Sequence, residues 1–483
     1  LLRELFDWTL ATFEQPGNAR KLQVALIAIG GYGRAELNPH SDVDIMLLHS
    51  GSMPSVNRIF SHPLLEKLTS AGGLIYTLYD LGLKVGHSVR NIQDAVNVAN
   101  DDMQTKTSLI ESRLITGDAG LFGQFQQRLE ARCVRNHVGN YLQMRIGNQD
   151  ARRVKFGNSA LLQEPNIKNG CGGLRDYQNL LWMTHFKYGA HTLEQLEAQG
   201  MVRPRNRRQL EVGYDFLLRT RNELHLQTKR LADDIPKTLQ PKIAWQLGYK
   251  DHSPARRLEA FMRDLYTHTR AIHLITRMVE RRLALRPKSA RRLPSLRSFF
   301  GGGKKTETLD GFNIIDGELM PISPRIFKDQ PRRLMRVFLH AQQRGLEFHP
   351  DLTQLLRDNV SLVNDDFIHD SENHETFLEI LNRRGDVAPA LRAMHEVDLL
   401  GRYIPEFGRM TCLVQHEFFH AYAADEHTLV CLEKLDQVWD AAQPPFAHYT
   451  HILQDIDLPY LLYLALFLHD TGKGMGSGDH VKD

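Results

Sequence analysis

The chain has 483 residues, of which 42% are hydrophobic and 24% charged, and its formal net charge is +3. This composition is ordinary for a globular protein of about three domains, and the small net charge excludes a strong general attraction to nucleic acid or anionic membranes. The four cysteines are widely spaced and form no Cys-x-x-Cys pair, which argues against a disulfide scaffold or zinc ribbon and fits a reducing cytoplasm. We expect no signal peptide at the start of the chain, and its longest apolar run, residues 458–468, is too short to span a bilayer and predicts a core helix.

The first chemical feature is a glycine-rich turn between two expected strands. Residues 1–22 have a helical pattern, the apolar run 24–29 predicts a short buried strand, and a second strand begins at Val43. The turn contains Gly30, Gly31 and Gly33, which let backbone N–H groups approach an anion. Asp42 and Asp44 alternate at the start of the second strand, so both carboxylates face the same side. Two carboxylates beside a phosphate-binding turn predict a site for a Mg²⁺-bound nucleoside triphosphate.

This order of features resembles the nucleotidyltransferase superfamily, whose signature is a Gly-rich turn followed by alternating hydrophobic and Asp residues. A Rossmann or Walker motif does not fit, because no G-x-G-x-x-G or G-K-[ST] opens a helix here. The resemblance implies that Asp42 and Asp44 hold one or two metal ions and that the turn cradles phosphate. We expect Ser41 to line the phosphate pocket or cap the turn, and Arg34 to join the nucleotide-binding residues. Each half of this pattern alone is more often an ordinary turn or a solvated strand edge.

The alternating run 84–90 predicts a strand that pairs beside these two aspartates. Nucleotidyltransferases usually take a third carboxylate from such a strand. The nearest candidates here are Asp80, just before the strand, and Asp94, just after it, and His87 is a further candidate for a polar role.

The flanking segments are expected to be helical. A helical pattern covers residues 58–81, with an interruption near Gly72–Gly73. Further helices are expected over 101–117 and from Asp118, a predicted N-cap, to Arg145.

A second glycine-rich loop lies at residues 164–173, with a helix expected from Leu174. A helix N-terminus beside Lys168 and Arg175 is a natural neighbour for phosphate, although composition alone favours an ordinary helix–loop–helix turn. The motifs Pro-Asn-Ile-Lys and Gly-Gly-Leu-Arg-Asp resemble a loop of the bifunctional uridylyltransferase/uridylyl-removing family that acts on the PII nitrogen-signalling protein. The Gly-Gly-Tyr-Gly-Arg…Ser-Asp-Val-Asp and Val-Gly-His-Ser-Val-Arg motifs match the same family.

The middle of the chain is helical and basic. Arg221, Asn222 and His225 share one helix face, which by default is solvated and salt-bridged, and the resemblance suggests a helical domain that closes over the nucleotide. Residues 281–305 are rich in Arg, Lys, Pro and Gly and predict a linker. Residues 311–320 predict a small hairpin that turns at Asp316–Gly317, and from about residue 324 we expect helices without a competing strand.

The second chemical feature is a group of His and Asp residues near the C-terminal end. Asp-Glu-His-Thr-Leu at 425–429, followed by His469-Asp470 at the end of an apolar helix, resembles the HD metal-dependent phosphohydrolase superfamily. Imidazole and carboxylate groups suit a divalent metal that activates water, so His427, His469 and Asp470 are the expected ligands, with His480 as a weaker candidate. HD sites normally need a further Asp tens of residues later, and the family continues into two ligand-sensing ACT domains. We therefore expect a C-terminally truncated chain with a partial HD domain.

Together these features predict an α+β, predominantly helical protein. The expected segments are a small mixed-sheet nucleotidyltransferase domain at 1–140 and an all-helical domain closing over the nucleotide at 141–285. A basic linker with a small hairpin at 286–320 is expected to precede a helical region at 321–483, whose partial HD core starts at about residue 425.

The resemblance implies an enzyme that transfers UMP from UTP to a tyrosine of the PII protein, with Mg²⁺ or Mn²⁺ at the transferase site. In the intact protein a divalent metal at the HD site would support removal of UMP, and glutamine would act as effector. A cytoplasmic protein without a DNA or membrane partner is expected. The alternatives are another HD-containing nucleotidyltransferase that modifies tRNA or protein, and a non-catalytic nucleotide sensor. A duplicated adenylyltransferase does not fit, since no second Gly-Gly…Asp-x-Asp pattern occurs.

Overall fold

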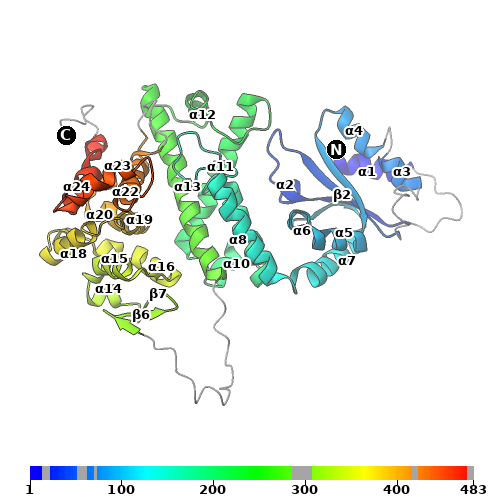
Figure 1. The fold of residues 1–483 in the computed structure, drawn as a ribbon. Coiled ribbons are helices and arrows are strands. Elements are labelled where there is room, and N and C mark those ends of the chain that lie inside the picture. Colours follow the sequence, from blue (N-terminus) through cyan, green and yellow to red (C-terminus); the bar gives the residue numbers. More distant parts are fainter. Residues whose placement is uncertain (13–21, 52–62, 70–72, 285–306, 415–421, 476–483) are drawn as a thin grey trace, which may run out of the picture. The chain divides into compact units, whose positions relative to one another are not determined.

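A computed structural model describes residues 1–12, 22–51, 63–69, 73–284, 307–414 and 422–475 (Figure 1). The chain forms two compact units. Unit 1 contains Leu1–Ala151, Gln178–Gly200 and Leu218–Asp233, and unit 2 contains Arg152–Tyr177, Met201–Leu217 and Asp234–Asp483. Helices dominate both units and each has one small sheet, which confirms the predicted α+β, predominantly helical class. The predicted domain boundaries after residues 140 and 285 stay predictions.

Unit 1 is built on a four-stranded sheet with the order β3-β2-β1-β4. Its strands are β1 (Val24–Ala28), β2 (Val43–His49), β3 (Val85–Asn91) and β4 (Arg113–Gly117). β1 is antiparallel to β2 and β4, whereas β2 is parallel to β3. The strands predicted at 24–29, from 43 and at 84–90 are therefore confirmed, as is the pairing of the third strand beside Asp44.

Helices cover both faces of this sheet (Figure 1). Side chains alternate along β1, so that Leu26 packs with α1 (Leu2–Ala11), α3 (Pro63–Thr69) and α4 (Leu74–Asp80) on one face. On the other face Ile27 packs with α5 (Ile92–Asp101), α6 (Met103–Ile110) and α7 (Ala119–Leu129). Every residue of β1 is buried in consequence, which explains its continuous apolar run.

The helix predicted over 101–117 is wrong in its second half. Arg113–Gly117 forms β4, which pairs with β1 at the edge of the sheet. Ile115 and Thr116 are β-branched residues that suit a strand, and pairing with a segment about 90 residues away overrides the local helical pattern. The N-cap at Asp118 is confirmed, because its Oδ1 accepts a hydrogen bond of 2.8 Å from the Leu121 N–H. The helix expected to continue from Asp118 to Arg145 is instead divided between α7, a π-helical turn at Glu130–Val134, and α8 (Val138–Lys155).

Unit 2 contains a second four-stranded sheet with the order β5-β6-β7-β8. The strands are β5 (Glu307–Leu309), β6 (Phe312–Ile315), β7 (Glu318–Pro321) and β8 (Glu347–Phe348). The hairpin predicted at Asp316–Gly317 is confirmed, with positive φ angles of 52° and 83° at the two turn residues. The expectation of helices alone after residue 324 is wrong at β8, whose two residues are too short to show a strand periodicity.

The remaining elements are helical. They are α9 (Leu174–Tyr188), α10 (Leu193–Ala198), α11 (Pro204–Thr228), α12 (Gln240–Gln246), α13 (Pro254–Ala284), α14 (Ile326–Asp329), α15 (Arg333–Arg344), α16 (Pro350–Asn359), the 3₁₀ turn Val360–Leu362, α17 (Asp365–Ile368), α18 (Ser371–Leu381), α19 (Ala388–Glu396), α20 (Leu399–Tyr403), α21 (Pro405–Arg409), α22 (Ala424–Trp439), α23 (Ala447–Gln454), α24 (Pro459–Leu468) and the 3₁₀ turn Thr471–Met475. The linker predicted over 281–305 is wrong for residues 281–284, which form the last turn of α13, and the rest of it lies outside the described residues, as does His480.

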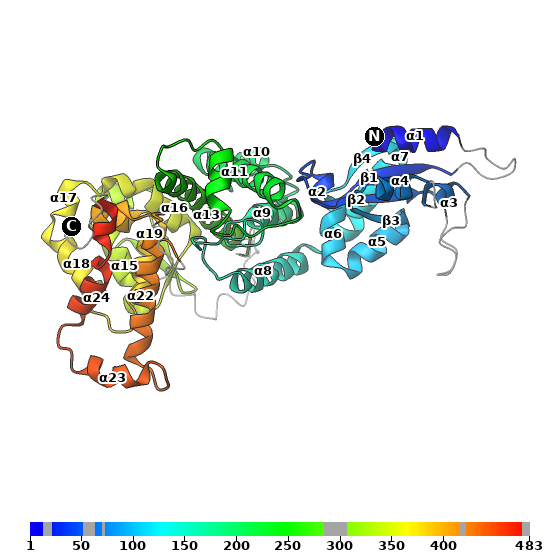
Figure 2. The same ribbon diagram turned by 90° about the horizontal axis from the view of Figure 1, so that it is seen from above.

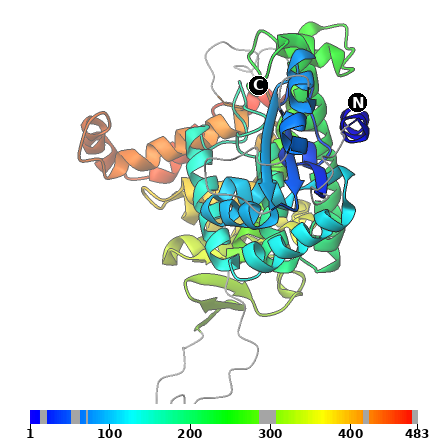
Figure 3. The ribbon, with the colours of Figure 1, turned by 90° about the vertical axis from the view of Figure 1, so that its right-hand side faces the viewer.

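Helices α15, α19, α22 and α24 share one apolar core in unit 2, which includes the fully buried Phe338, Leu391, Leu429 and Phe467. Helices α22 and α24 run side by side, with α23 at their far end (Figure 2), and the small sheet lies at a separate edge of the unit (Figure 3). Tyr463 and Phe467 of α24 are buried in this core, as the core-helix prediction requires. Among the described helices, no single one is long and apolar enough to cross a bilayer. The segments Ala447–Gln454 and Pro459–Gly474 reach the required length and apolar character only when they are taken together, and they are bent by 120° relative to each other.

Candidate functional sites

The glycine-rich turn after β1 is a short helical turn, α2 (Gly30–Gly33), whose conformation favours glycine at Gly30 and requires it at Gly33. Gly30 has a φ of +56°. A Cβ at Gly33 would come 2.2 Å from the carbonyl oxygen of Glu111, so the backbone of the turn packs directly on the segment before β4. The turn is therefore fixed against the sheet, with no bulky side chain at either glycine.

The carboxylate of Asp44 lies beside this turn. Asp44 pairs in register with Gly86 of the parallel strand β3, and a Cβ at Gly86 would come 2.3 Å from Asp44 Oδ1. A Cβ at Gly30 would lie 3.5 Å from both Asp44 Oδ2 and Ser108 Oγ. The structure therefore brings the predicted Asp44, Gly30 and third strand together and adds Ser108 from α6. Sequence reasoning missed Ser108, because its surroundings in the sequence are those of an ordinary helix.

Asp42 and Ser41 lie just before β2. The Asp42 side chain is exposed, and the Ser41 N–H donates a 3.0 Å hydrogen bond to the Asn38 carbonyl. Asp80 ends α4, and Asp94 lies in the first turn of α5, where its N–H is bound by the Asn91 cap.

The described residues contain one cluster of three His, Cys, Asp or Glu side chains with metal-ligand spacing, and it does not include Asp80 or Asp94. The assignment of a third transferase carboxylate stays a prediction. Asp42 and Asp44 fit Mg²⁺, since this ion commonly takes one or two protein carboxylates and completes its shell with phosphate oxygens and water.

Arg34 has partners within the turn region. Its guanidinium forms ion pairs of 2.7 Å with Glu36 and with Glu111, and Trp182 Nε1–H also donates to Glu111. The nearby Arg113 donates hydrogen bonds to the carbonyls of Gly33 and Tyr32. These contacts assign Arg34 a role in holding the turn, and its predicted contact with the nucleotide stays a prediction.

The segment before Asp42 is held by the C-terminal half of α11, within unit 1. Asn38 is 4% exposed, and its amide donates to Asn222 Oδ1 at 2.6 Å and accepts from Arg221. Arg221 also forms a 2.8 Å ion pair with Asp233. Arg221, Asn222 and His225 share one helix face, as predicted. This face packs against the segment before Asp42, so the prediction that it is solvated is wrong.

His225 completes this contact in its neutral form. It is fully buried, its Nδ1 accepts from the His40 N–H at 3.3 Å, and its Nε2–H donates to the Ala232 carbonyl at 3.1 Å. Burial, followed by the charge of Arg221, lowers the pKa of His225 to about 4. The imidazole of His225 is therefore neutral in the folded chain, because a proton on Nδ1 would point at the His40 N–H, which is also a donor.

In unit 2 the loop that carries Lys168 is compact. Asn166 Oδ1 accepts hydrogen bonds from the N–H groups of Lys168 and Asn169, at 3.2 and 2.7 Å. Gly172 has a φ of +70°, and a Cβ there would come 1.8 Å from the Thr269 carbonyl oxygen. Helix α9 begins at Leu174 as predicted, and the Arg175 N–H donates to the Lys168 carbonyl at 2.9 Å. The loop is closely packed, while the predicted phosphate contacts of Lys168 and Arg175 stay predictions.

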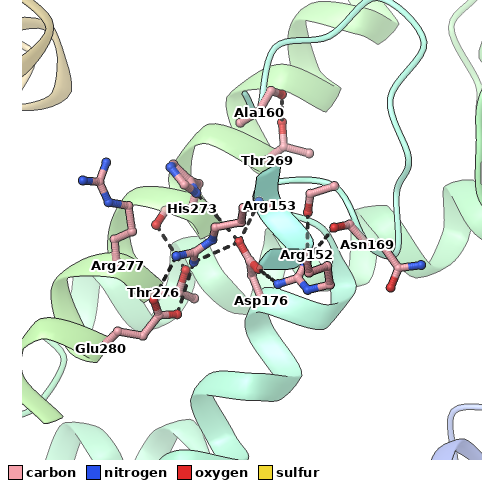
Figure 4. Close-up of polar contacts among 12 residues, drawn as sticks. Arg152, Arg153, Ala160, Asn169, Asp176, Thr269, His273, Thr276, Arg277 and Glu280 are labelled. Atoms are coloured by element: carbon pink, nitrogen blue, oxygen red, sulfur yellow. Dashed lines mark hydrogen bonds and ion pairs between the residues drawn. The ribbon is translucent and has the colours of Figure 1, made fainter. Parts of the chain in front are cut away.

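A buried ionic network anchors this loop (Figure 4). Asp176 is fully buried, accepts from the Gly172 N–H at 2.9 Å, and is paired with Arg152 and with Arg153. Arg153 also forms a 3.1 Å ion pair with Glu280.

Three neighbouring groups set the ionisation of Asp176. Burial alone would raise its pKa, but the His273 imidazole and the charges of Arg153 and Arg152 outweigh burial and hold the pKa far below its usual value. The carboxylate thus stays ionised. Sequence reasoning included Asp176 in a motif but assigned it no role.

The predicted HD residues meet in unit 2. His427 lies on α22, and His469 and Asp470 follow α24; one ligand atom from each lies within 4.8 Å of the other two. His469 Nδ1–H donates to the Leu466 carbonyl at 2.6 Å, which leaves Nε2 to bind a metal. Asp470 Oδ2 lies 3.3 Å from His469 Nε2 and 2.9 Å from Lys473 Nζ. Two imidazoles and one carboxylate at this spacing fit a divalent metal.

The two acidic residues before His427 have structural contacts. Asp425 is fully buried and accepts from the Cys412 N–H at 3.1 Å, with His395 Nε2 at 3.2 Å. Glu426 forms a 3.0 Å ion pair with Arg392. Among the described residues, His427 belongs to the metal-ligand cluster, whereas Asp425 and Glu426 do not.

Comparison with known proteins gives matches along the whole chain. Residues 140–280 match the GlnD PII-uridylyltransferase family, and residues 312–403 match the uridylyltransferase GlnD third domain. The chain is 32% identical over 486 residues to a bifunctional uridylyltransferase/uridylyl-removing enzyme of Azospirillum brasilense, and 32% identical over 487 residues to one of Rhodospirillum rubrum. Each alignment covers 99% of this chain and 50% of the relative, so the chain spans about half the length of these curated relatives.

Proposed function

Because the chain belongs to the GlnD uridylyltransferase family, we propose that unit 1 transfers UMP from UTP to a tyrosine hydroxyl of a PII signalling protein and releases pyrophosphate. The observation that carries this proposal is the placement of Asp44 between Gly30 of the turn and Gly86 of β3. This placement sets a carboxylate beside a backbone turn in which Gly33 has no room for a side chain and the positive φ of Gly30 disfavours one.

Asp42 and Asp44 would hold Mg²⁺ or Mn²⁺ together with the triphosphate, and the bound ion would neutralise the charge that develops on the leaving pyrophosphate. The α2 turn would receive the phosphates against its backbone. The tyrosine oxygen of the partner would attack the α-phosphorus, and the bond between the α-phosphorus and the oxygen bridging to the β-phosphate would break. Contacts from Asn38, Arg221 and His225 would keep the segment before Asp42 in place during this step.

A second activity is proposed for unit 2, supported by the spacing of His427, His469 and Asp470. These residues would hold a divalent metal, which would supply activation of water for hydrolysis of the UMP–tyrosine phosphodiester. Lys473, which lies 2.9 Å from Asp470, would offer a positive charge to the phosphate. Glutamine as an effector and a cytoplasmic location complete the proposal for the whole protein, and both rest on the family resemblance.

The transfer proposal is tested by supplying the chain with Mg²⁺, a purified PII protein and each α-labelled nucleoside triphosphate in turn. We expect label from UTP on PII, and a loss of at least about 100-fold in Asp44→Asn and in Asp42→Asn, since a ligand of the reacting complex is removed. Asp80→Asn and Asp94→Asn serve as matched carboxylate controls, and a comparable loss in one of them would identify a third ligand. Absence of labelling with every nucleotide, by a folded chain, would contradict the proposal and favour a nucleotide sensor.

The hydrolase proposal has its own test. PII carrying labelled UMP is incubated with the chain and Mn²⁺, and release of UMP is followed. Release by the wild type that disappears in His427→Ala and persists in Asp44→Asn would assign the reaction to unit 2. Release that survives the loss of His427 would contradict this assignment.

A further inference from the structure

A hydroxyl group from a neighbouring helix lies beside the α2 turn of unit 1. Ser108 is on α6, which packs against this turn, and a Cβ at Gly30 would lie 3.5 Å from both Ser108 Oγ and Asp44 Oδ2. Apart from the backbone of the turn and the neighbouring Ile29, these two oxygens are the only heavy atoms of the described residues within 4 Å of that point. The space over Gly30 is therefore bounded by a hydroxyl oxygen and by an oxygen of a proposed metal ligand.

The Ser108 hydroxyl is available to a ligand. A serine or threonine within a helix commonly donates to the carbonyl oxygen one turn earlier, as Thr107 does to the Met103 carbonyl at 2.7 Å. Within the part of the chain that the structure describes, Ser108 Oγ has no hydrogen-bond partner. The side chain is half-buried, so a ligand at the turn can reach it. A serine that merely fills a small space beside the turn is the competing explanation, and it predicts no contact with a ligand.

Buried polar contacts hold the helix that carries Ser108. Thr107 Oγ1 accepts a 3.1 Å hydrogen bond from Arg145 Nη2 and lies 2.9 Å from the Tyr141 hydroxyl oxygen. The Arg145 guanidinium lies 4.2 Å from the centre of the Trp182 ring. Because α6 is tied to its neighbours through the residue next to Ser108, the hydroxyl is placed at the turn before a ligand binds, which lowers the entropy lost on binding.

We infer that the Ser108 hydroxyl donates a hydrogen bond to a phosphate oxygen of UTP bound at the α2 turn. This inference rests on the proposed transfer of UMP and adds to that site a residue that recognises the triphosphate. The Asp44 carboxylate accepts hydrogen bonds and has none to donate, so of the two groups over Gly30 the hydroxyl is the one that can donate to phosphate. A hydrogen bond to a charged oxygen is stronger than one between neutral groups, so Ser108 should contribute to the affinity for the nucleotide.

The test measures nucleotide binding without transfer. The probe is α,β-methylene-UTP, in which a methylene group replaces the oxygen that would leave, and its affinity for the chain in Mg²⁺ is measured by isothermal titration calorimetry. In Ser108→Ala we expect the affinity to fall by about tenfold or more, because a hydrogen bond to a charged oxygen is lost. Ser112→Ala is the matched control, since Ser112 is also half-buried but does not lie within 4 Å of the point over Gly30, and it should keep the wild-type affinity.

Amide hydrogen exchange separates a contact with the nucleotide from a structural role. The Gly33 N–H donates to the Ile29 carbonyl at 3.0 Å, so its exchange in the nucleotide-free chain reports on the integrity of the turn. Weaker binding by Ser108→Ala with unchanged exchange at Gly33 would support the hydrogen bond to phosphate. Faster exchange at Gly33 would assign the weaker binding to the fold of the turn and overturn the inference, as would an unchanged affinity.

The same titration separates this inference from the transfer proposal. Binding of the analogue by the wild type that is lost in Asp44→Asn and kept in full by Ser108→Ala would overturn the role of Ser108 and leave the transfer site standing. Failure of the folded wild type to bind the analogue would contradict the inference and the transfer proposal together.

Discussion

The carboxylate of Asp44 lies directly over the α-carbon of Gly86, its in-register partner on the neighbouring strand β3. A Cβ at Gly86 would come 2.3 Å from Asp44 Oδ1, which is far closer than non-bonded atoms approach each other. The position of one proposed metal ligand is therefore linked to the absence of a side chain on the next strand. Gly86 is the glycine of the Val-Gly-His-Ser-Val-Arg motif, and the contact explains why a glycine suits that position.

Gly86→Ala is the first prediction. The added methyl group should rotate Asp44 away from the turn, and a displacement of this size in a reacting complex costs on the order of 100-fold in rate. Because β3 is only partly buried, the melting temperature should change little. The rate of label transfer from UTP and a thermal melt of the same preparation measure the two effects.

Gly123→Ala is the matched control for this variant. Gly123 lies within α7 in the same unit, and a Cβ there meets nothing within 4 Å. The control should keep full transfer activity and gain slightly in helix stability. Wild-type activity in Gly86→Ala would show that Asp44 does not need its observed position.

The sequence predicted the parts of the site that depend on local pattern. A glycine-rich turn, a strand with alternating aspartates and a following strand are each visible within a short window, and β2–β3 pairing then brings Asp44 and Gly86 together. The contact between Asn38 and Arg221 joins residues 183 positions apart, and no periodicity encodes it. Ser108 was missed for the same reason, because its proximity to Gly30 arises from the packing of α6 on the sheet.

The errors in the fold have a similar origin. Residues 113–117 follow a helical segment and were predicted to continue it, yet pairing with β1 makes them an edge strand. β8 has two residues and exists only because β7 lies beside it. Tertiary pairing overrides local preference in both cases, and the preference itself was weak.

Arg221→Lys is the second prediction. The guanidinium binds Asn38 and Asp233 at once, whereas a lysine ammonium keeps the charge but not the planar fork. We expect a loss of roughly 1.5–3 kcal/mol in the unfolding free energy of unit 1, the usual value of a buried hydrogen bond to a charged group, and a slower transfer of UMP. Urea unfolding and a transfer assay at saturating UTP measure these effects. The exposed Arg230→Lys is the control, and equal behaviour of the two variants would contradict the anchoring role.

His225 supplies the third prediction, which concerns pH. Its pKa is about 4 in the folded chain against an ordinary value of 6.5, so the unfolded chain binds more protons between these values. Stability therefore falls as the pH drops from about 6.5 towards 4. In His225→Asn the side-chain oxygen can still accept from the His40 N–H but does not titrate. Melting temperatures measured from pH 7 to pH 4 should fall less steeply in the variant, and parallel curves would rule out His225 as a source of the acid sensitivity.

Asp176→Asn is the fourth prediction and addresses the buried network of unit 2. Replacing the carboxylate leaves the charges of Arg152 and Arg153 without their shared partner, and breaking a buried ion pair in this way costs about 3–5 kcal/mol. The folded-state pKa of Asp176 is depressed, so its contribution is fully present above the ordinary carboxyl pKa and is lost as the pH falls through the folded value. The unfolding free energy lost in Asp176→Asn should therefore be constant around neutral pH and should become smaller only in strong acid.

The comparison is with Asp329→Asn, which removes an exposed ion pair of 3.5 Å with Arg325, where the two side chains are 52% and 76% exposed. Solvent screens such a pair, so this variant should unfold like the wild type in guanidinium. Asp176→Asn should unfold at a lower denaturant concentration, and exchange of the Gly172 amide hydrogen, which is bonded to the carboxylate, should speed up. If the two variants unfold alike, the network does not anchor the Lys168 loop, and the loop must be held by its backbone contacts with Thr269 instead.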